Sequence, residues 1–194
     1  MSTSTNTEYY ELVYKHRAGS CSTTFLSNRE FARSLDIGDS LTESWPPDVS
    51  LSMNPERPKD VALIDYVHNL EALLVASPRM VEFFEQQKLP DLEFLPVTIL
   101  DHKGRQASSE YKIIHCCHVV DCVDQEQSEF EWDGLSEPSM VVEKVVLKAD
   151  ALEGDSRMVT PKFVPGKVFY RADLVEAIKG QDFKGVTFLR DLFE

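Results

Sequence analysis

The order of apolar and polar residues along the chain predicts short strands that alternate with a few helices. Tyr9–Tyr14 alternates with a period of two and is typical of a first strand. Residues 19–60 are rich in Gly, Ser, Asn, Asp and Pro, with a short helix favoured at Arg29–Leu35. Trp45-Pro46-Pro47 cannot continue a helix. We expect this irregular region to wrap over the domain rather than to form a second one.

An internal repeat is the clearest pattern in the chain. Residues 73–97 and 167–191 align without a gap at an offset of 94 residues, and each copy reads as strand, helix and strand. Ser77 and Pro78 fit a helix N-cap and first helical position, and Asp173 stands at the start of the second helix. The matching helix positions are apolar and predict a buried stripe: Met80, Val81, Phe83 and Phe84 in one copy, Leu174, Val175, Ala177 and Ile178 in the other.

The stretch between the two copies supplies further strands. Glu110–Val123 is rich in β-branched residues and predicts a long central strand, and Met140–Leu147 predicts another. We therefore expect an α+β (mixed α/β) fold, a single domain over residues 1–194 with a mostly antiparallel or mixed sheet. Residues 1–8 are expected to be a flexible tail. The pattern leaves open whether the two repeat units share one sheet or pack as two lobes.

The charge balance narrows the class of partner. The chain has 33 acidic and 20 basic residues, a net charge of −13, and an apolar fraction of 42% that is normal for a globular fold. Such a surface repels nucleic-acid phosphates and anionic lipids and attracts basic proteins. No stretch is apolar enough to span a membrane, and the polar start MSTSTNTE is not a signal peptide. These features predict a cytoplasmic protein with free thiols.

One segment combines negative charge with aromatic residues. Residues 121–137 hold seven acids and no Lys or Arg, and Phe130 and Trp132 alternate with the acids. Carboxylates orient a basic partner and aromatic side chains anchor it. The predicted partner-binding residues are Asp124, Glu126, Glu129, Glu131, Trp132 and Asp133. An ordinary solvent-facing loop remains the alternative interpretation of this segment.

The sequence His115-Cys116-Cys117-His118, with Cys122 nearby, is the one metal-like cluster. On a strand, His115 and Cys117 would face one way and Cys116 and His118 the other, which splits the ligands between two faces. We therefore predict no metal site and no cofactor. Neither a helix N-terminus nor a basic cluster activates a cysteine, and no phosphate-binding or nucleophile motif is present, so we do not expect an enzyme. A small metal- or thiol-dependent enzyme that uses the segment from His115 to Cys122 is kept as the alternative.

Three stretches resemble immunity protein family eleven of bacterial polymorphic toxin systems, formerly a family of unknown function. They are LLVASPRMVEFFEQQKLPDLEFLPVTI, the segment from Tyr111 through Val119-Val120-Asp121-Cys122-Val123-Asp124 to Ser128, and VFYRADLVEAIKGQDFKGVTFLRDL, within residues 63–193. The resemblance implies an antitoxin that binds and neutralises a cognate secreted toxin, such as an effector of type VI secretion, without catalytic residues of its own. An adaptor of a secretion system is the second alternative. Neither the toxin nor an oligomeric state is predicted.

Overall fold

The computed structural model shows an α+β fold and describes residues 8–132, 134, 140–152, 154 and 156–190. Its helices are α1 (Ala32–Ile37), which follows the short 3₁₀ helix η1 (Arg29–Phe31), α2 (Pro78–Gln87) and α3 (Ala172–Lys179), and a second 3₁₀ helix, η2, covers Ala149–Ala151. The strands of the first half are β1 (Tyr9–Tyr14), β2 (Thr23–Leu26), β3 (Ser50–Met53), β4 (Tyr66–Val67), β5 (Val75–Ala76), β6 (Leu92–Pro96) and β7 (Thr98–Leu100). Those of the second half are β8 (Gln106–Ser108), β9 (Lys112–Cys116), β10 (Val119–Val120), β11 (Glu129–Trp132), β12 (Met140–Lys144), β13 (Met158–Pro161), β14 (Phe169–Arg171) and β15 (Val186–Leu189). The predicted first strand and the predicted short helix after residue 28 are both confirmed.

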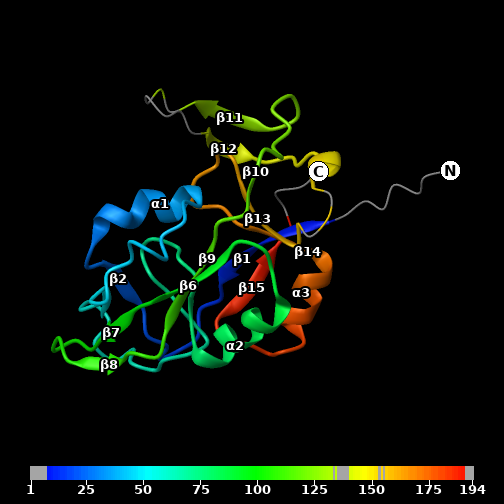
Figure 1. Cartoon of the computed structure of the whole chain (residues 1–194). Helices are drawn as coiled ribbons and strands as arrows, with labels where there is room; N and C mark the ends of the chain where they lie inside the picture. Colours follow the sequence, from blue (N-terminus) through cyan, green and yellow to red (C-terminus); the bar gives the residue numbers. More distant parts are fainter. Residues whose placement is uncertain (1–7, 133, 135–139, 153, 155, 191–194) are drawn as a thin grey trace.

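The strands form four sheets of mixed and antiparallel type. The five-stranded sheet has the order β10-β13-β14-β1-β15, and two four-stranded sheets have the orders β2-β3-β7-β8 and β4-β5-β9-β6. The hairpin β11-β12 forms a two-stranded sheet at the top of the molecule in Figure 1. The predicted mostly antiparallel or mixed pairing is therefore confirmed, but it is divided among several small sheets.

Both repeat units fold as predicted, and both have the same topology. In the first unit β5 and β6 flank β9, which is antiparallel to each of them. In the second unit β14 and β15 flank β1 in the same way. The two strands of each unit are therefore parallel and separated by one inserted strand, a split strand–helix–strand arrangement.

The two helices start differently. The Ser77 hydroxyl accepts a hydrogen bond from the Met80 amide at 3.4 Å, and Pro78 is the first helical residue, as predicted for α2. Asp173 lies in the first turn of α3, but Arg171 precedes that helix and gives no side-chain cap. The Arg171 guanidinium instead binds the Asp173 carboxylate, with Nε and Oδ1 2.6 Å apart.

One hydrophobic core joins the two units. It contains the apolar faces of α2 and α3 together with residues of β4, β5, β9, β13 and β14, among them Phe84, Ile114, Tyr170, Leu174 and Ile178. The units thus lie in two sheets packed on a shared core, which answers the question that the sequence left open. A second core, around Leu51 and Ile99, includes residues of the β2-β3-β7-β8 sheet. A third core, around Val159 and Phe169, lies beside the hairpin segment.

The predicted long strand over Glu110–Val123 is wrong in its extent. β9 is central in its sheet but ends at Cys116, and the chain re-enters the five-stranded sheet as β10, which is parallel to β13. The Cys117 amide donates to the Asp91 carbonyl at the break. Gly38 also approaches closely here, because a Cβ atom on it would lie 2.7 Å from Val119 Cγ2. Both contacts lie at the place where β9 ends although the apolar sequence runs on.

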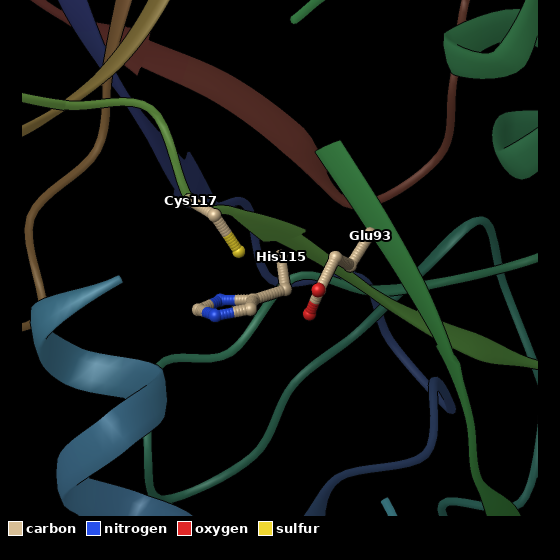
Figure 2. Close-up of side chains that lie close together, drawn as sticks. All are labelled: Glu93, His115 and Cys117. Atoms are coloured by element: carbon tan, nitrogen blue, oxygen red, sulfur yellow. The ribbon is translucent and has the colours of Figure 1, made fainter. Parts of the chain in front are cut away.

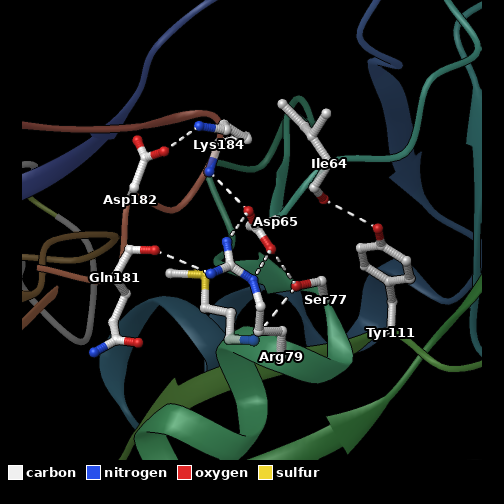
Figure 3. Close-up of polar contacts among 9 residues, drawn as sticks. Ile64, Asp65, Ser77, Arg79, Tyr111, Gln181, Asp182 and Lys184 are labelled. Carbon is white, nitrogen blue, oxygen red and sulfur yellow. Dashed lines mark hydrogen bonds and ion pairs between the residues drawn. The ribbon is translucent and has the colours of Figure 1, made fainter. Parts of the chain in front are cut away.

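A hydrogen-bond network centred on Asp65 connects the two units (Figure 3). Its carboxylate accepts hydrogen bonds from Ser77 Oγ at 2.8 Å, Arg79 Nη2 at 2.7 Å and the Lys184 amide at 2.8 Å. Arg79 also donates from Nη1 to the Gln181 carbonyl at 3.0 Å. Asp65 therefore fixes the start of α2 and the loop that leads into β15.

This network predicts a pH dependence of stability. Burial alone would raise the pKa of Asp65, but hydrogen bonds from Arg79, the Lys184 amide and Ser77 outweigh it and lower that pKa. A carboxyl group whose pKa is lowered by folding stabilises the protein above its unfolded pKa of about 3.9 and loses this contribution as the pH falls through the folded pKa. The free energy of unfolding of wild type should exceed that of Asp65→Asn by a constant amount from pH 7 to about 5. The difference should shrink below about pH 4. Urea denaturation of both proteins at pH 7 and below about pH 4 measures this difference in the free energy of unfolding. A difference that does not shrink at low pH would contradict the lowered pKa of Asp65.

Candidate functional site

The acidic segment forms the base and first strand of the β11-β12 hairpin. Within the residues that the structure describes, β11 and β12 pair only with each other, with Phe130 opposite Val142 and Trp132 opposite Met140. At the base, the Asp124 amide donates to the Val146 carbonyl and the Val146 amide donates to Ser128 Oγ. The hairpin is therefore anchored at one end and extends away from the repeat units (Figure 1).

Asp124 shapes the anchored end of the hairpin. Its carboxylate accepts hydrogen bonds from the amides of Glu126 and Gln127, at 3.0 and 3.2 Å, and from Gln127 Nε2 at 2.7 Å. The Gln127 side chain and these amides lower the pKa of Asp124. An aspartate that accepts from the amides after it stabilises a turn. Asp124 thus has a structural role, besides any contact with a partner.

The strand separates the acids from the aromatic residues. Phe130 and Trp132 share one face of β11, where their rings are in contact, and Glu131 between them points to the other face; the register against β12 shifts between Glu129 and Phe130. The two acids are exposed, as is Glu126 in the turn. The predicted mixed surface therefore consists of an acidic face and an aromatic face, and Asp133 lies outside the described residues.

The aromatic face packs the hairpin against the loop after β13. The Trp132 ring meets Phe130 and Phe163 edge to face, with centroid distances of 5.6 and 5.7 Å. Trp132 still exposes 45% of its surface. Its contacts therefore hold the hairpin in place while part of the ring remains available to a partner.

Replacing Trp132 with alanine is expected to loosen the hairpin. Each edge-to-face aromatic pair contributes about 0.5–1.5 kcal/mol. Hydrogen exchange of the Glu129–Trp132 amides should therefore become about tenfold faster, while amides of β9 stay unchanged. Trp132→Phe, which keeps an aromatic ring, is the control and should exchange nearly as slowly as wild type. Equal exchange in wild type and Trp132→Ala would show that the ring contacts do not hold the strand.

A second cluster joins the histidine and cysteine segment to a neighbouring strand (Figure 2). Glu93 on β6 lies directly opposite His115 on β9, and Cys117 follows His115 by two residues. One ligand atom from each of Glu93, His115 and Cys117 lies within 4.8 Å of the other two. The predicted alternation is confirmed for Cys116, which points into the shared core. Sequence reasoning missed Glu93, because only the strand register brings it to this face.

Hydrogen bonds join the cluster to the segment that follows α1. His115 Nε2 donates to the Asp39 carbonyl at 2.8 Å, because a carbonyl oxygen only accepts. The Glu93 carboxylate accepts from Ser40 Oγ at 2.6 Å and from the Leu41 amide at 2.9 Å. Burial opposes ionisation of Glu93, but these hydrogen bonds and those from Thr42 outweigh it and lower the pKa of Glu93 to about 2. Glu93 is therefore ionised at neutral pH.

The geometry disfavours thiol catalysis at this cluster. The Nε2 atom of His115 is bonded to the Asp39 carbonyl rather than to Cys117. Burial, followed by the charge of Glu93, raises the pKa of Cys117 to about 12, and burial also lowers the pKa of His115. A thiol is a nucleophile only as the thiolate. Cys117 is thus a protonated, weakly reactive thiol, although it lies beside a histidine and a carboxylate.

Comparisons with known proteins agree with the pattern seen in the sequence. A family model described as the Immunity protein family (Imm11) matches residues 9–190. A search of curated proteins finds no match. Within the part of the chain that the structure describes, every helix lacks the length and apolar character needed to span a bilayer. The matched region includes the first repeat unit, all but the last residue of the second, the hairpin and the Glu93–His115–Cys117 cluster.

Proposed function

The chain belongs to the immunity protein family Imm11, and we propose that it neutralises its toxin by binding it and occluding the toxin's active site. The family match over residues 9–190 is the observation that carries the proposal. Occlusion needs a protein surface rather than a reaction centre. The raised pKa of Cys117, together with the hydrogen bond from His115 Nε2 to the Asp39 carbonyl, agrees with a non-catalytic mechanism at this cluster.

The acidic face of the hairpin is the proposed toxin-binding surface. Glu126, Glu129 and Glu131 are exposed there, and the exposed part of Trp132 lies at the margin of the same hairpin. A net charge of −13 favours encounter with a basic protein, and local carboxylates orient it. The toxin partner would therefore be basic around its active site. Asp133 is retained in the proposed surface on the sequence pattern alone.

The cellular compartment and the class of toxin are part of the same proposal. The four cysteines are free thiols, which suits a reducing compartment such as the cytoplasm. The partner would be a toxin of the polymorphic class, including those delivered by type VI secretion. An adaptor that binds a basic component of a secretion apparatus is the rival, and it predicts binding without protection from a toxin.

Growth of a bacterial host that expresses the toxin encoded by the adjacent gene tests the proposed role. Co-expression of the chain should restore growth, and the two proteins should copurify. Restored growth without a complex would argue against occlusion. A complex that leaves the toxin lethal would favour the adaptor.

A further inference from the structure

The Glu93–His115–Cys117 cluster provides a carboxylate, an imidazole and a thiol from one side of two paired strands. These are the three side-chain types that bind zinc in proteins. A tetrahedral zinc with bonds of about 2.0–2.3 Å places its ligand atoms about 3.3–3.8 Å apart. The three donors already lie within 4.8 Å of one another, so changes of at most about 1.0–1.5 Å in their separations, made by side-chain rotation, bring them to that spacing.

The surroundings match those of a metal-binding histidine. Because Nε2 of His115 donates to the Asp39 carbonyl, Nδ1 of the neutral ring carries a free lone pair. Metal-bound histidines usually donate their other N–H to a carbonyl or carboxylate in this way, which fixes the ring. Hydrogen bonds from Ser40 and Leu41 hold the Glu93 carboxylate similarly. These hydrogen bonds therefore restrain the His115 ring and the Glu93 carboxylate before any ion arrives.

An ion can reach the cluster from the surface. A hollow of about 390 Å³ is lined by Gly38, Ser40, Asp91, Glu93 and Cys117, among other residues. Glu93 and Cys117 line it and are partly exposed, while His115 does not line it and has 4% of its surface exposed. The hollow leaves space for water as a further ligand, as in sites with three protein ligands.

We propose that Glu93, His115 and Cys117 bind a divalent cation of the zinc class, with water completing the coordination. Binding replaces the Cys117 S–H proton by the metal and releases that proton to solvent. The ion would join β6, the end of β9 and, through the Asp39 carbonyl, the segment after α1. This inference is independent of toxin binding, because the hairpin contributes none of the ligands.

Cobalt(II) titration of the purified, chelator-treated full chain tests the site. Wild type should bind one equivalent and show the near-ultraviolet charge-transfer band of a thiolate–cobalt bond together with visible bands of tetrahedral cobalt. Cys117→Ser should lose the charge-transfer band. His115→Gln should lower the affinity by at least about 100-fold, since loss of an outer-sphere partner alone costs about 10–100-fold.

His118→Gln is the matched control, because His118 is next to Cys117 in sequence but is not one of the three clustered residues. It should keep the affinity and both sets of bands. Far-ultraviolet circular dichroism shows whether each variant is folded. If a ligand variant does not fold, the wild-type titration still decides the question, because folded wild type without a thiolate–cobalt band overturns the proposal. Retention of the band in folded Cys117→Ser, which would assign it to another thiol, overturns it equally.

Discussion

Replacing Asp65 with alanine is expected to lower the free energy of unfolding by about 3 kcal/mol. Asp65 is 9% exposed and its carboxylate accepts from Ser77, Arg79 and the Lys184 amide. Removing one partner of a buried charge pair costs about 3–5 kcal/mol, and the exposure of Arg79 places the expected loss at the lower end of that range. The loss should appear in urea denaturation as a lower midpoint with little change in slope.

Comparing Arg79→Ala with Asp65→Ala distinguishes the contribution of the buried carboxylate from that of its exposed partner. The Arg79 side chain is 52% exposed, so its ion pair with Asp65 is screened by solvent. Removing it should cost only about 1 kcal/mol, including its contact over the Phe183 ring. Equal losses in Asp65→Ala and Arg79→Ala would show that the ion pair alone matters. A loss below about 1 kcal/mol in Asp65→Ala would show that this network contributes little to the stability of the fold.

Reversing three charges on the hairpin is expected to weaken toxin binding by at least about 100-fold. The variant is Glu126→Lys/Glu129→Lys/Glu131→Lys, which places positive charge on the face proposed to meet a basic toxin. Like charges brought together at an interface cost several kcal/mol, and each 1.4 kcal/mol changes the dissociation constant tenfold. Titration calorimetry at physiological salt measures the change.

A second triple variant controls for net charge. Glu56→Lys/Glu82→Lys/Glu110→Lys makes the same change in charge at three exposed positions outside the hairpin. This variant lowers the long-range electrostatic attraction between the chain and a basic toxin by the same amount, but its dissociation constant should stay within a few-fold of wild type. Equal weakening by both variants would mean that only total charge matters. Full binding by the hairpin variant would place the toxin on another surface.

The repeat units show what the sequence could predict about the fold. The start of α2 depends on Ser77, Pro78 and the Met80 amide, which are adjacent in sequence, so local pattern was sufficient. The pairing of the strands inserted into each unit was not predictable in this way. β9 and β1 pair with segments far along the chain, and the apolar pattern does not specify such partners. The chain at the early end of β9 packs against Gly38, another distant residue that local pattern does not reveal.

The candidate sites likewise contain residues that the local sequence pattern could place and residues that it could not. Strand alternation correctly placed Cys116 in the core, away from the face of His115 and Cys117, because that period is a local property. Glu93 could not be predicted, since its position beside His115 depends on the register of β6 against β9. For the hairpin, the sequence suggested a single acidic and aromatic surface. The same alternation, applied to Glu131 and Trp132, separates that surface into two faces.

Titration of the purified chain into its purified toxin tests the central claim most directly. The toxin's activity should fall in proportion to the chain added and reach zero when the two are equimolar in a stable complex. Each toxin molecule would then be blocked by one immunity protein. Loss of toxin activity at far less than one equivalent would instead indicate catalytic inactivation. Full toxin activity in the presence of excess chain would contradict the assignment of this chain as the immunity protein for that toxin.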